Sequence, residues 1–327
     1  MNTAMRRRRL GFVGIAAALA VSLAACSSSG DAADTSAAGD SDGYDIGVLV
    51  FDTTVPYFTP MIQGEKDAAA ELGVTLDIQN GQGDLAQEIA IVNQFVAQGK
   101  DAIVLTTSDG KGIVPALQAA HEAGIPVLAN NTVIEDDKVI TYVGSDNIRV
   151  GNTLAQGVCE TVPADGKIAV ILGVMGSSPQ LDRLTGLEEG LAENCPGVTI
   201  LDQQTANWDN AEALAVGQDF LNKFGPGSID AIVGEGPEIQ TPAQWAKENG
   251  RTDVKFIGVD IPKSVAPLVA DGTIAAQVYQ SPYEQGYWSI EDIVNWLNGD
   301  KDKVPTPFHY SENVVVTSNN IDTVEPY

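Results

Sequence analysis

The sequence predicts an α/β fold with two domains, each built on a doubly wound parallel sheet. Buried apolar runs alternate with amphipathic helical segments from residue 45 almost to the end of the chain. Strands that alternate with helices form parallel sheets with helices on both faces, and right-handed crossovers make such sheets doubly wound. About ten strands are too many for one compact sheet of this type, so we expect two.

The first half of the folded chain shows this alternation clearly. The run DIGVLVF at 45–51 is typical of a buried strand, and the segment 57–73 has apolar residues at helical spacing and ends at a glycine. The same patterns predict strands at 74–80, 101–107, 125–130 and 139–146, and helices at 84–99, 112–124 and 148–162.

The second half repeats the architecture without repeating the sequence. Strands are expected at 167–173, 198–204, 230–236, 254–260, 274–280 and 312–318, and helices near 180–194, 210–224, 240–249, 264–272 and 283–298. In such sheets ligands bind beyond the carboxyl ends of the strands, near the point where the strand order reverses. Residues just after each strand are therefore the candidate site residues.

The first 43 residues predict export and attachment to a membrane. Four arginines at 6–9 precede an apolar stretch at 10–25, which is shorter than the roughly 20 residues of a membrane-spanning helix. The exit sequence Leu-Ala-Ala-Cys resembles the bacterial lipobox, which implies that residues 1–25 are a signal peptide and that Cys26 is acylated. The alternatives are an ordinary signal peptide whose cleavage site happens to contain a cysteine, and a short single-pass anchor. The Ser-, Ala-, Gly- and Asp-rich residues 26–43 are typical of a disordered linker.

Charge and residue usage exclude several classes of function. The net charge is −26, and removal of residues 1–25 deletes four arginines and no acid, which leaves the mature chain near −30. A chain this acidic repels nucleic acid and anionic lipid, so contact with a membrane is expected through the lipid anchor alone. The two histidines, His121 and His309, are far apart, and neither a CxxC nor an HExxH motif is present. We expect neither a metal site nor a cofactor.

Two cysteines remain besides Cys26. Cys159 closes one predicted helix and Cys195 closes the next, so both lie at the same edge of the second sheet. Two cysteines in an exported domain are typical of one disulfide bond, and two buried free thiols are the alternative.

Aromatic, amide and carboxylate side chains gather after the predicted strands. This set is typical of a site for a polyhydroxylated ligand, because C–H groups stack on rings while hydroxyls both donate and accept hydrogen bonds. Each residue by itself could serve as a turn or helix cap instead. The candidate ligand-binding residues are Asp52, Tyr57, Phe58, Asn131, Gln180, Trp208, Gly236, Asp260 and Gln280.

The chain from about residue 46 to residue 316 resembles the ribose- and galactose-binding type of periplasmic sugar-binding proteins, the solute receptors of ABC importers. The markers are PYFTPMIQGEKDAAAELG, GIPVLANN, YVGSDN, GLEEGL, KFIGVD and AAQVYQSPYEQGYWSIEDI. The resemblance implies a type I binding-protein fold, with two lobes joined by three crossings near 145–146, 280–281 and 308–310. The first lobe is then 44–145 plus 281–309, and the second 146–280 plus 310–327.

The resemblance also implies roles for individual residues. Tyr57 and Phe58 match the first-lobe aromatic pair, Trp208 matches the opposing aromatic, and Asp260 and Gln280 match hydrogen-bonding positions. Several positions depart from the ribose type. Asn131 stands where many members have Asp, Thr132 and Leu181 stand where arginines occur, and Gly236-Pro237 replaces Asn-Asp. Because these changes remove donors, we expect a less oxygenated sugar, a sugar alcohol or another small polar solute instead of ribose.

The expected function is capture of such a solute by a lipid-anchored monomer on the outer face of the cytoplasmic membrane, and delivery to an ABC permease. A receptor that signals to a sensor or chemotaxis protein is the main alternative. An NAD-linked enzyme is weaker: GQGDLA at 81–86 has the G-x-G-x-x-A form, but Asp101 begins a strand where the motif's acid should end one. A hydrolase lacks G-x-S-x-G, and a sugar-responsive repressor lacks its DNA-binding head.

Overall fold

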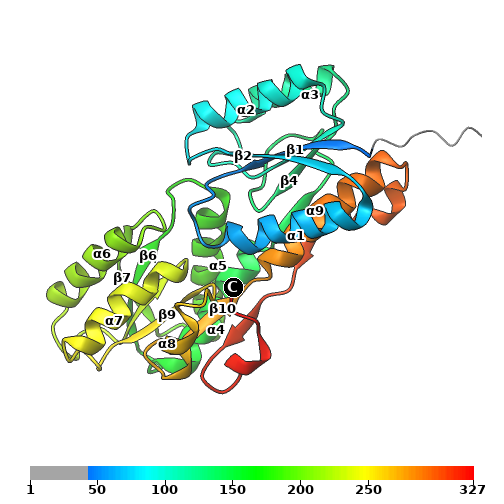
Figure 1. The fold of residues 1–327 in the computed structure, drawn as a ribbon. Coiled ribbons are helices and arrows are strands. Elements are labelled where there is room, and N and C mark those ends of the chain that lie inside the picture. Colours follow the sequence, from blue (N-terminus) through cyan, green and yellow to red (C-terminus); the bar gives the residue numbers. More distant parts are fainter. Residues whose placement is uncertain (1–42) are drawn as a thin grey trace, which may run out of the picture. The chain divides into compact units, whose positions relative to one another are not determined.

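The computed structural model describes residues 43–327, which contain two six-stranded sheets, each covered by helices (Figure 1). The predicted signal peptide, the predicted acylation site Cys26 and nearly all of the predicted linker lie outside these residues. The predicted fold of two α/β lobes on doubly wound sheets is confirmed.

The first sheet has the strand order β11-β5-β4-β3-β1-β2, and all of its neighbouring strands are parallel. Helices α1 and α9 pack on one face of it, and α2 and α3 pack on the other. This sheet and these four helices are called the first lobe. Its elements are β1 Asp45–Val50, α1 Phe58–Leu72, β2 Thr75–Asn80, α2 Leu85–Gln98, β3 Ala102–Leu105, α3 Val114–Glu122, β4 Val127–Asn130, β5 Tyr142–Ser145, α9 Pro282–Leu297 and β11 Phe308–Ser311.

The second sheet has the order β12-β10-β9-β8-β6-β7, and its edge strand β12 pairs antiparallel with β10. Helices α4 and α5 pack on one face, and α6, α7 and α8 on the other. This sheet and its helices are called the second lobe. Its elements are α4 Asn147–Thr161, β6 Lys167–Leu172, α5 Ser178–Asn194, β7 Thr199–Thr205, α6 Asn210–Lys223, β8 Ala231–Gly234, α7 Gln240–Glu248, β9 Lys255–Val259, α8 Ala266–Ala270, β10 Ala276–Tyr279 and β12 Val314–Val316, with the short 3-10 helices η1 Pro237–Ile239 and η3 Ile321–Thr323. A further 3-10 helix, η2 Lys301–Lys303, follows α9 in the first lobe.

Local sequence explains where the main elements begin and end. The central strands β3, β4 and β8 are buried along their whole length, as expected for parallel strands covered on both faces. Asp84, Asp146 and Asp209 precede α2, α4 and α6, and each carboxylate accepts hydrogen bonds from backbone amides of the first turn. The strand order reverses between β1 and β3 in the first sheet and between β6 and β8 in the second. In each sheet a ligand site is therefore expected beyond the carboxyl ends of these strands.

The chain passes between the lobes after β5, after β10 and after β11. The third passage differs from expectation, because the residues predicted to cross form a strand. Phe308–Ser311 pairs in register with Tyr142–Ser145, so Tyr310 and Ser311 belong to the first sheet and the expected boundary at residue 309 is two residues too early. Alternation gave no signal here, since β11 is a short edge strand that follows the 3-10 helix Lys301–Lys303 after residues 304–307, without a long intervening helix.

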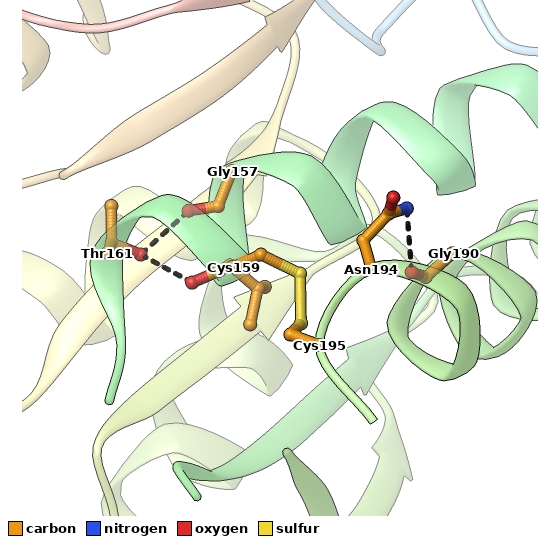
Figure 2. The surroundings of a disulfide bond; sticks show 7 residues. Gly157, Cys159, Thr161, Gly190, Asn194 and Cys195 are labelled. Atoms are coloured by element: carbon orange, nitrogen blue, oxygen red, sulfur yellow. Dashed lines mark hydrogen bonds between the residues drawn. A yellow bond between two sulfur atoms is a disulfide. The ribbon is translucent and has the colours of Figure 1, made fainter. Parts of the chain in front are cut away.

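A disulfide bond joins Cys159 of α4 to Cys195, the residue that follows α5, and this is the predicted pair (Figure 2). The two helices that it links pack side by side on one face of the second sheet. Next to the bond, Thr161 Oγ1 donates to the Gly157 carbonyl at 2.7 Å and Asn194 Nδ2 donates to the Gly190 carbonyl at 2.9 Å. In both bonds a side chain near the end of a helix donates to the carbonyl four residues earlier in the same helix.

Removal of the disulfide should lower the free energy of unfolding. The cross-link closes a loop with a sequence separation of 36 residues, which on the chain-entropy model corresponds to roughly 4 kcal/mol as an upper value. We expect the double variant Cys159→Ala, Cys195→Ala to lose about 2–4 kcal/mol in urea unfolding, with a larger m-value because its unfolded chain is less constrained. Unchanged unfolding, or two free thiols in the purified protein before reduction, would contradict this.

Candidate functional site

A cavity lies at the carboxyl ends of both sheets, and its walls come from both lobes. First-lobe residues Tyr57, Phe58 and Asn131 face second-lobe residues that include Trp208 and Asp260. The lobes also touch beside it, where the Val133 amide donates to Ser178 Oγ at 3.2 Å. The remaining lining residues are Phe51, Val55, Pro56, Thr106, Thr107, Ser108, Thr132, Val174, Ser177, Pro179, Arg183, Asn210, Gly236, Pro237, Glu238, Gln240, Pro262 and Ser264.

The first-lobe wall is a pair of aromatic rings at the start of α1. The rings of Tyr57 and Phe58 meet edge to face with centroids 5.6 Å apart. The Tyr57 hydroxyl donates to Gln285 Oε1 at 2.7 Å and accepts from Asn131 Nδ2 at 3.2 Å. These two hydrogen bonds fix the position of the Tyr57 hydroxyl group and hold the ring in the cavity wall.

The second-lobe wall is the indole of Trp208, which lies directly on backbone. A methyl group at Gly236 would lie 2.7 Å from Trp208 Cδ1, and one at Gly173 would overlap the other ring of the indole. Glycine at both positions is what allows this close approach. The indole Nε1 is buried and lacks a hydrogen-bond partner within the described residues, so it has a donor to offer a ligand.

Three of the predicted site residues have left-handed backbone. The φ angles are 62° at Asn131, 58° at Trp208 and 75° at Asp260. Residues with a Cβ seldom adopt this conformation, and for a bulky residue such as tryptophan it is a genuine outlier. Backbone held this way costs of order 1–3 kcal/mol per residue and collects at ligand-binding sites. The strain therefore coincides with the cavity.

Asp260 supplies a buried carboxyl group to the cavity. Its Oδ1 accepts from Gln280 Nε2 at 2.8 Å, and Gln280 itself is completely buried behind it. Burial raises the pKa of Asp260 to about 6, against the opposing effect of the nearby Arg183 charge. Gln280 thus orients the carboxyl group from outside the cavity lining.

Arg183 is a cavity residue that the sequence analysis missed. It lies on α5, is 5% exposed and donates from Nε to Asn147 Oδ1 at 3.0 Å, from Nη1 to the Glu235 carbonyl at 2.6 Å and from Nη2 to Gln280 Oε1 at 3.3 Å. One guanidinium therefore lines the cavity two residues beyond Leu181, which is itself 50% exposed and outside the lining.

A periodic signal for Arg183 was present in the sequence. The buried positions of α5 include Pro179, Gln180, Arg183, Gly186 and Leu187, which fall at helical spacing on one face. A charged residue on an otherwise buried face requires a partner or a function. The alignment with family positions drew attention to residue 181, on the solvent side, instead.

Glu238 is the second cavity residue that the sequence analysis missed. It lies in the 3-10 helix after β8 and is 1% exposed, and neither of its carboxyl oxygens has a hydrogen-bond partner among the described residues. Burial raises its pKa to about 8, although backbone amides of Gly236 and of Glu238 itself approach and partly oppose the shift. Glu238 lies two residues beyond Gly236, the candidate residue that follows β8, and only the turn of the 3-10 helix brings its side chain to the cavity lining.

The structure brings together six of the nine candidate ligand-binding residues. The cavity is lined by Tyr57, Phe58, Asn131, Trp208, Gly236 and Asp260, and not by Asp52, Gln180 or Gln280. Asp52 instead accepts from the amide and hydroxyl of Thr54, both at 2.9 Å, which is a side-chain turn of the kind that aspartate favours. Gln180 accepts from the Gly176 amide at 3.2 Å.

The histidines and Asp101, which the sequence analysis considered for other functions, lie outside the cavity lining. Within residues 43–327 no group of three metal-ligating side chains is present, and none of the helices there is long and apolar enough to cross a membrane. His121 pairs with Asp136 and His309 with Asp292, all outside the cavity lining. Asp101 accepts from the Asp45 amide at 2.7 Å, at the amino end of the first sheet and opposite the cavity edge.

Two lobes with doubly wound sheets and a cavity at their facing strand ends define a two-lobed ligand-binding protein. Residues 46–301 match the family model described as a periplasmic binding protein domain. That match covers more than half of the chain, so this protein belongs to the periplasmic binding protein family, and the resemblance found in the sequence is confirmed.

Several characterised members are similar over most of the chain. The xylitol-binding protein of Mycolicibacterium smegmatis is 29% identical over 253 residues, which cover 77% of this chain and 70% of the relative. The ribose import binding protein of Bacillus subtilis is 28% identical over 269 residues, covering 82% and 87%. The crystal structure of a Caulobacter myo-inositol binding protein bound to myo-inositol superposes with a TM-score of 0.79 at 26% identity, covering 86% of this chain and 95% of that one.

The substitution Gly236→Ala should destabilise the protein by disturbing the Trp208 wall. The added methyl would meet the indole at 2.7 Å and also the Glu238 carboxyl, and overpacking of this kind costs about 1–3 kcal/mol. The backbone φ of Gly236 is −156°, so the effect would be steric and not conformational.

Gly225→Ala is the matched control, because an added methyl there meets no atom within 4 Å. We expect its free energy of unfolding to stay within about 1 kcal/mol of the parent. Equal stability of the two variants in urea unfolding would show that the indole does not lie against Gly236.

Proposed function

We propose that this protein is an extracytoplasmic receptor that captures a small polyhydroxylated solute, a sugar or a sugar alcohol, and delivers it to an ABC importer. The observation that carries the proposal is the pairing of aromatic faces from opposite lobes, Tyr57 and Phe58 against Trp208, around buried polar side chains. The xylitol-, ribose- and myo-inositol-binding relatives support the same class of ligand.

The chemistry of the lining suits a ligand with apolar C–H faces and polar edges. The rings provide stacking surface, while Arg183, Asn131 and the Trp208 Nε1 donate and Asp260 accepts. A hydroxyl-rich ligand satisfies such buried groups, which would otherwise lose water without compensation. Because the ligand would touch both lobes, its binding shifts the population toward the form in which the lobes are closed on it.

We propose binding without chemical conversion. The lining combines donors, acceptors and rings but brings neither histidine into the cavity described for residues 43–327. A receptor that presents the closed form to a sensor or chemotaxis protein would use the same cavity, and the proposal favours the importer because the ribose import relative covers 82% of this chain.

The lobe boundaries and the anchor belong to the same proposal. We take residues 1–25 as a signal peptide, Cys26 as the acylated first residue and 26–43 as the tether, with the first lobe at 44–145 plus 281–311 and the second at 146–280 plus 312–327. The final boundaries follow the extent of β11. A monomer tethered in this way keeps its acidic surface clear of anionic lipid.

The proposal is tested by a thermal-shift screen of the purified protein against pentoses, hexoses, polyols and non-sugar solutes. A specific ligand at 100-fold excess over Kd should stabilise the fold by about 2.7 kcal/mol. Trp208→Ala should then weaken binding of that ligand by about 1–3 kcal/mol in titration calorimetry, through loss of stacking and buried apolar area.

Trp296→Ala is the matched control for this variant, because Trp296 lies on α9 beside Lys301 and outside the cavity lining. Its affinity for the ligand should equal that of the parent. Equal losses in the two variants would place the ligand elsewhere, and a chemically altered solute after incubation would make the protein an enzyme.

The anchor is tested separately in the producing bacterium. Cys26→Ser should leave the precursor uncleaved or release the protein from the membrane fraction, because the thiol is the acylation site in the lipobox pattern. A Ser27→Ala variant should fractionate with the membrane as the parent does. A Cys26→Ser protein that is still cleaved and lipid-modified would refute the proposed attachment.

A further inference from the structure

The cavity contains more carboxyl groups than cationic groups. Arg183 is the one cationic residue among the lining residues, whereas Glu238 and Asp260 are two acidic ones. A third carboxyl, that of Glu235, is completely buried behind the wall and accepts from the Gly173 amide at 2.7 Å. In the described part of the chain, the cavity and the wall directly behind it therefore contain three carboxyl groups but only one guanidinium.

Arg183 does not neutralise these carboxyls by direct contact. Its three nitrogens donate to the Asn147 amide oxygen, the Glu235 backbone carbonyl and the Gln280 amide oxygen, all of them neutral acceptors. Among residues 43–327, the ion pairs within 4.0 Å include neither Arg183 nor any of the three carboxyls. The guanidinium is committed to holding the second-lobe wall in place.

Glu238 is the carboxyl group of this set that is buried without a hydrogen-bond partner for either oxygen in the described region. It is 1% exposed to solvent, it lines the cavity, and neither of its oxygens is hydrogen-bonded within the described chain. Burial raises the pKa of Glu238 to about 8, so without a cation in contact this group keeps its proton near neutral pH. Burial raises the pKa of Asp260 to about 6, where the Arg183 charge and the Gln280 amide oppose the shift. A cation in contact with Glu238 would stabilise its charged form.

We propose that the ligand itself supplies this cation: a polyhydroxylated solute that carries a basic amino group, such as an amino sugar or an amino polyol, with its ammonium at Glu238 and within reach of Asp260. The inference rests on the proposed function, because the hydroxyl-bearing body of the ligand occupies the same aromatic walls. It adds a positive charge to the ligand, whereas xylitol, ribose and myo-inositol, the ligands in the names of the relatives above, are uncharged.

The geometry of an ammonium group fits these acceptors better than a hydroxyl does. An ammonium has three donors and no acceptor, so it can donate to more than one carboxyl oxygen at once. Hydrogen bonds between charged partners are roughly twice as strong as neutral ones. A hydroxyl donates only one hydrogen bond and would leave buried carboxyl oxygens of Glu238 unpaired.

The experiment compares matched pairs of probes by titration calorimetry: 1-amino-1-deoxysorbitol against sorbitol, glucosamine against glucose, and galactosamine against galactose. We expect the amino member of at least one pair to bind at least tenfold more tightly, which is about 1.4 kcal/mol. Ethanolamine, which has the amine without the polyol body, should bind far more weakly than any amino probe that fits.

The variant Glu238→Gln keeps the shape of the side chain and removes its charge. It should reduce the preference for the amino probe to threefold or less while affinity for the neutral partner is kept. Glu65→Gln is the matched control, since Glu65 is also 1% exposed with an unpaired oxygen but lies on α1 outside the cavity lining. It should leave the preference unchanged.

The outcomes separate this inference from the proposed function. Neutral probes that bind as tightly as their amino partners in every pair would overturn the inference and leave the receptor function standing. Failure of both members of every pair, together with the wider sugar and polyol screen, would overturn both. An amine preference that survives Glu238→Gln would overturn the placement of the ammonium. The comparison of pairs on the parent protein decides the matter even if that variant does not fold.

Discussion

The amide of Gln285 connects the hinge of this protein to its ligand cavity. Its Nε2 donates to Ser145 Oγ at 3.1 Å and to Ser311 Oγ at 2.8 Å, at the ends of β5 and β11, and its Oε1 accepts from the Tyr57 hydroxyl at 2.7 Å. Gln285 lies on α9 just after the passage from β10 and is completely buried. One side chain thus links two crossings to the first-lobe aromatic wall, at a place where an unpaired amide would be costly.

The second lobe is organised in the same way around Arg183. Its guanidinium holds Asn147 at the first crossing, the backbone at the end of β8 and the Gln280 amide that orients Asp260. Each lobe therefore positions its cavity residues with a buried polar side chain that also contacts a crossing. Binding and hinge geometry share the same hydrogen bonds, so a change in one alters the other.

Much of this arrangement follows from the sequence. Alternating periodicity located the strands and helices of both lobes except β11, and the strand-end rule found Tyr57, Phe58, Asn131, Trp208, Gly236 and Asp260, which do line one cavity. The strand-end rule also selected Asp52, which does not line the cavity because its carboxylate accepts a hydrogen bond from the Thr54 amide in a local turn. Residue lists after strands do not reveal helix positions, so Arg183, which enters from the buried face of α5, was missed. Depth of burial, which makes Glu238 exceptional, is a tertiary property.

The left-handed backbone at Asn131, Trp208 and Asp260 has a consequence for how such a receptor diversifies. Glycine at these positions would relieve the local conformational cost, but each replacement would delete a side chain that faces the ligand. Thermal robustness and recognition therefore compete at the same three residues. Selection for stability alone would therefore replace binding residues in the loops and leave both sheets unchanged. The fold would be retained while the ligand specificity changed.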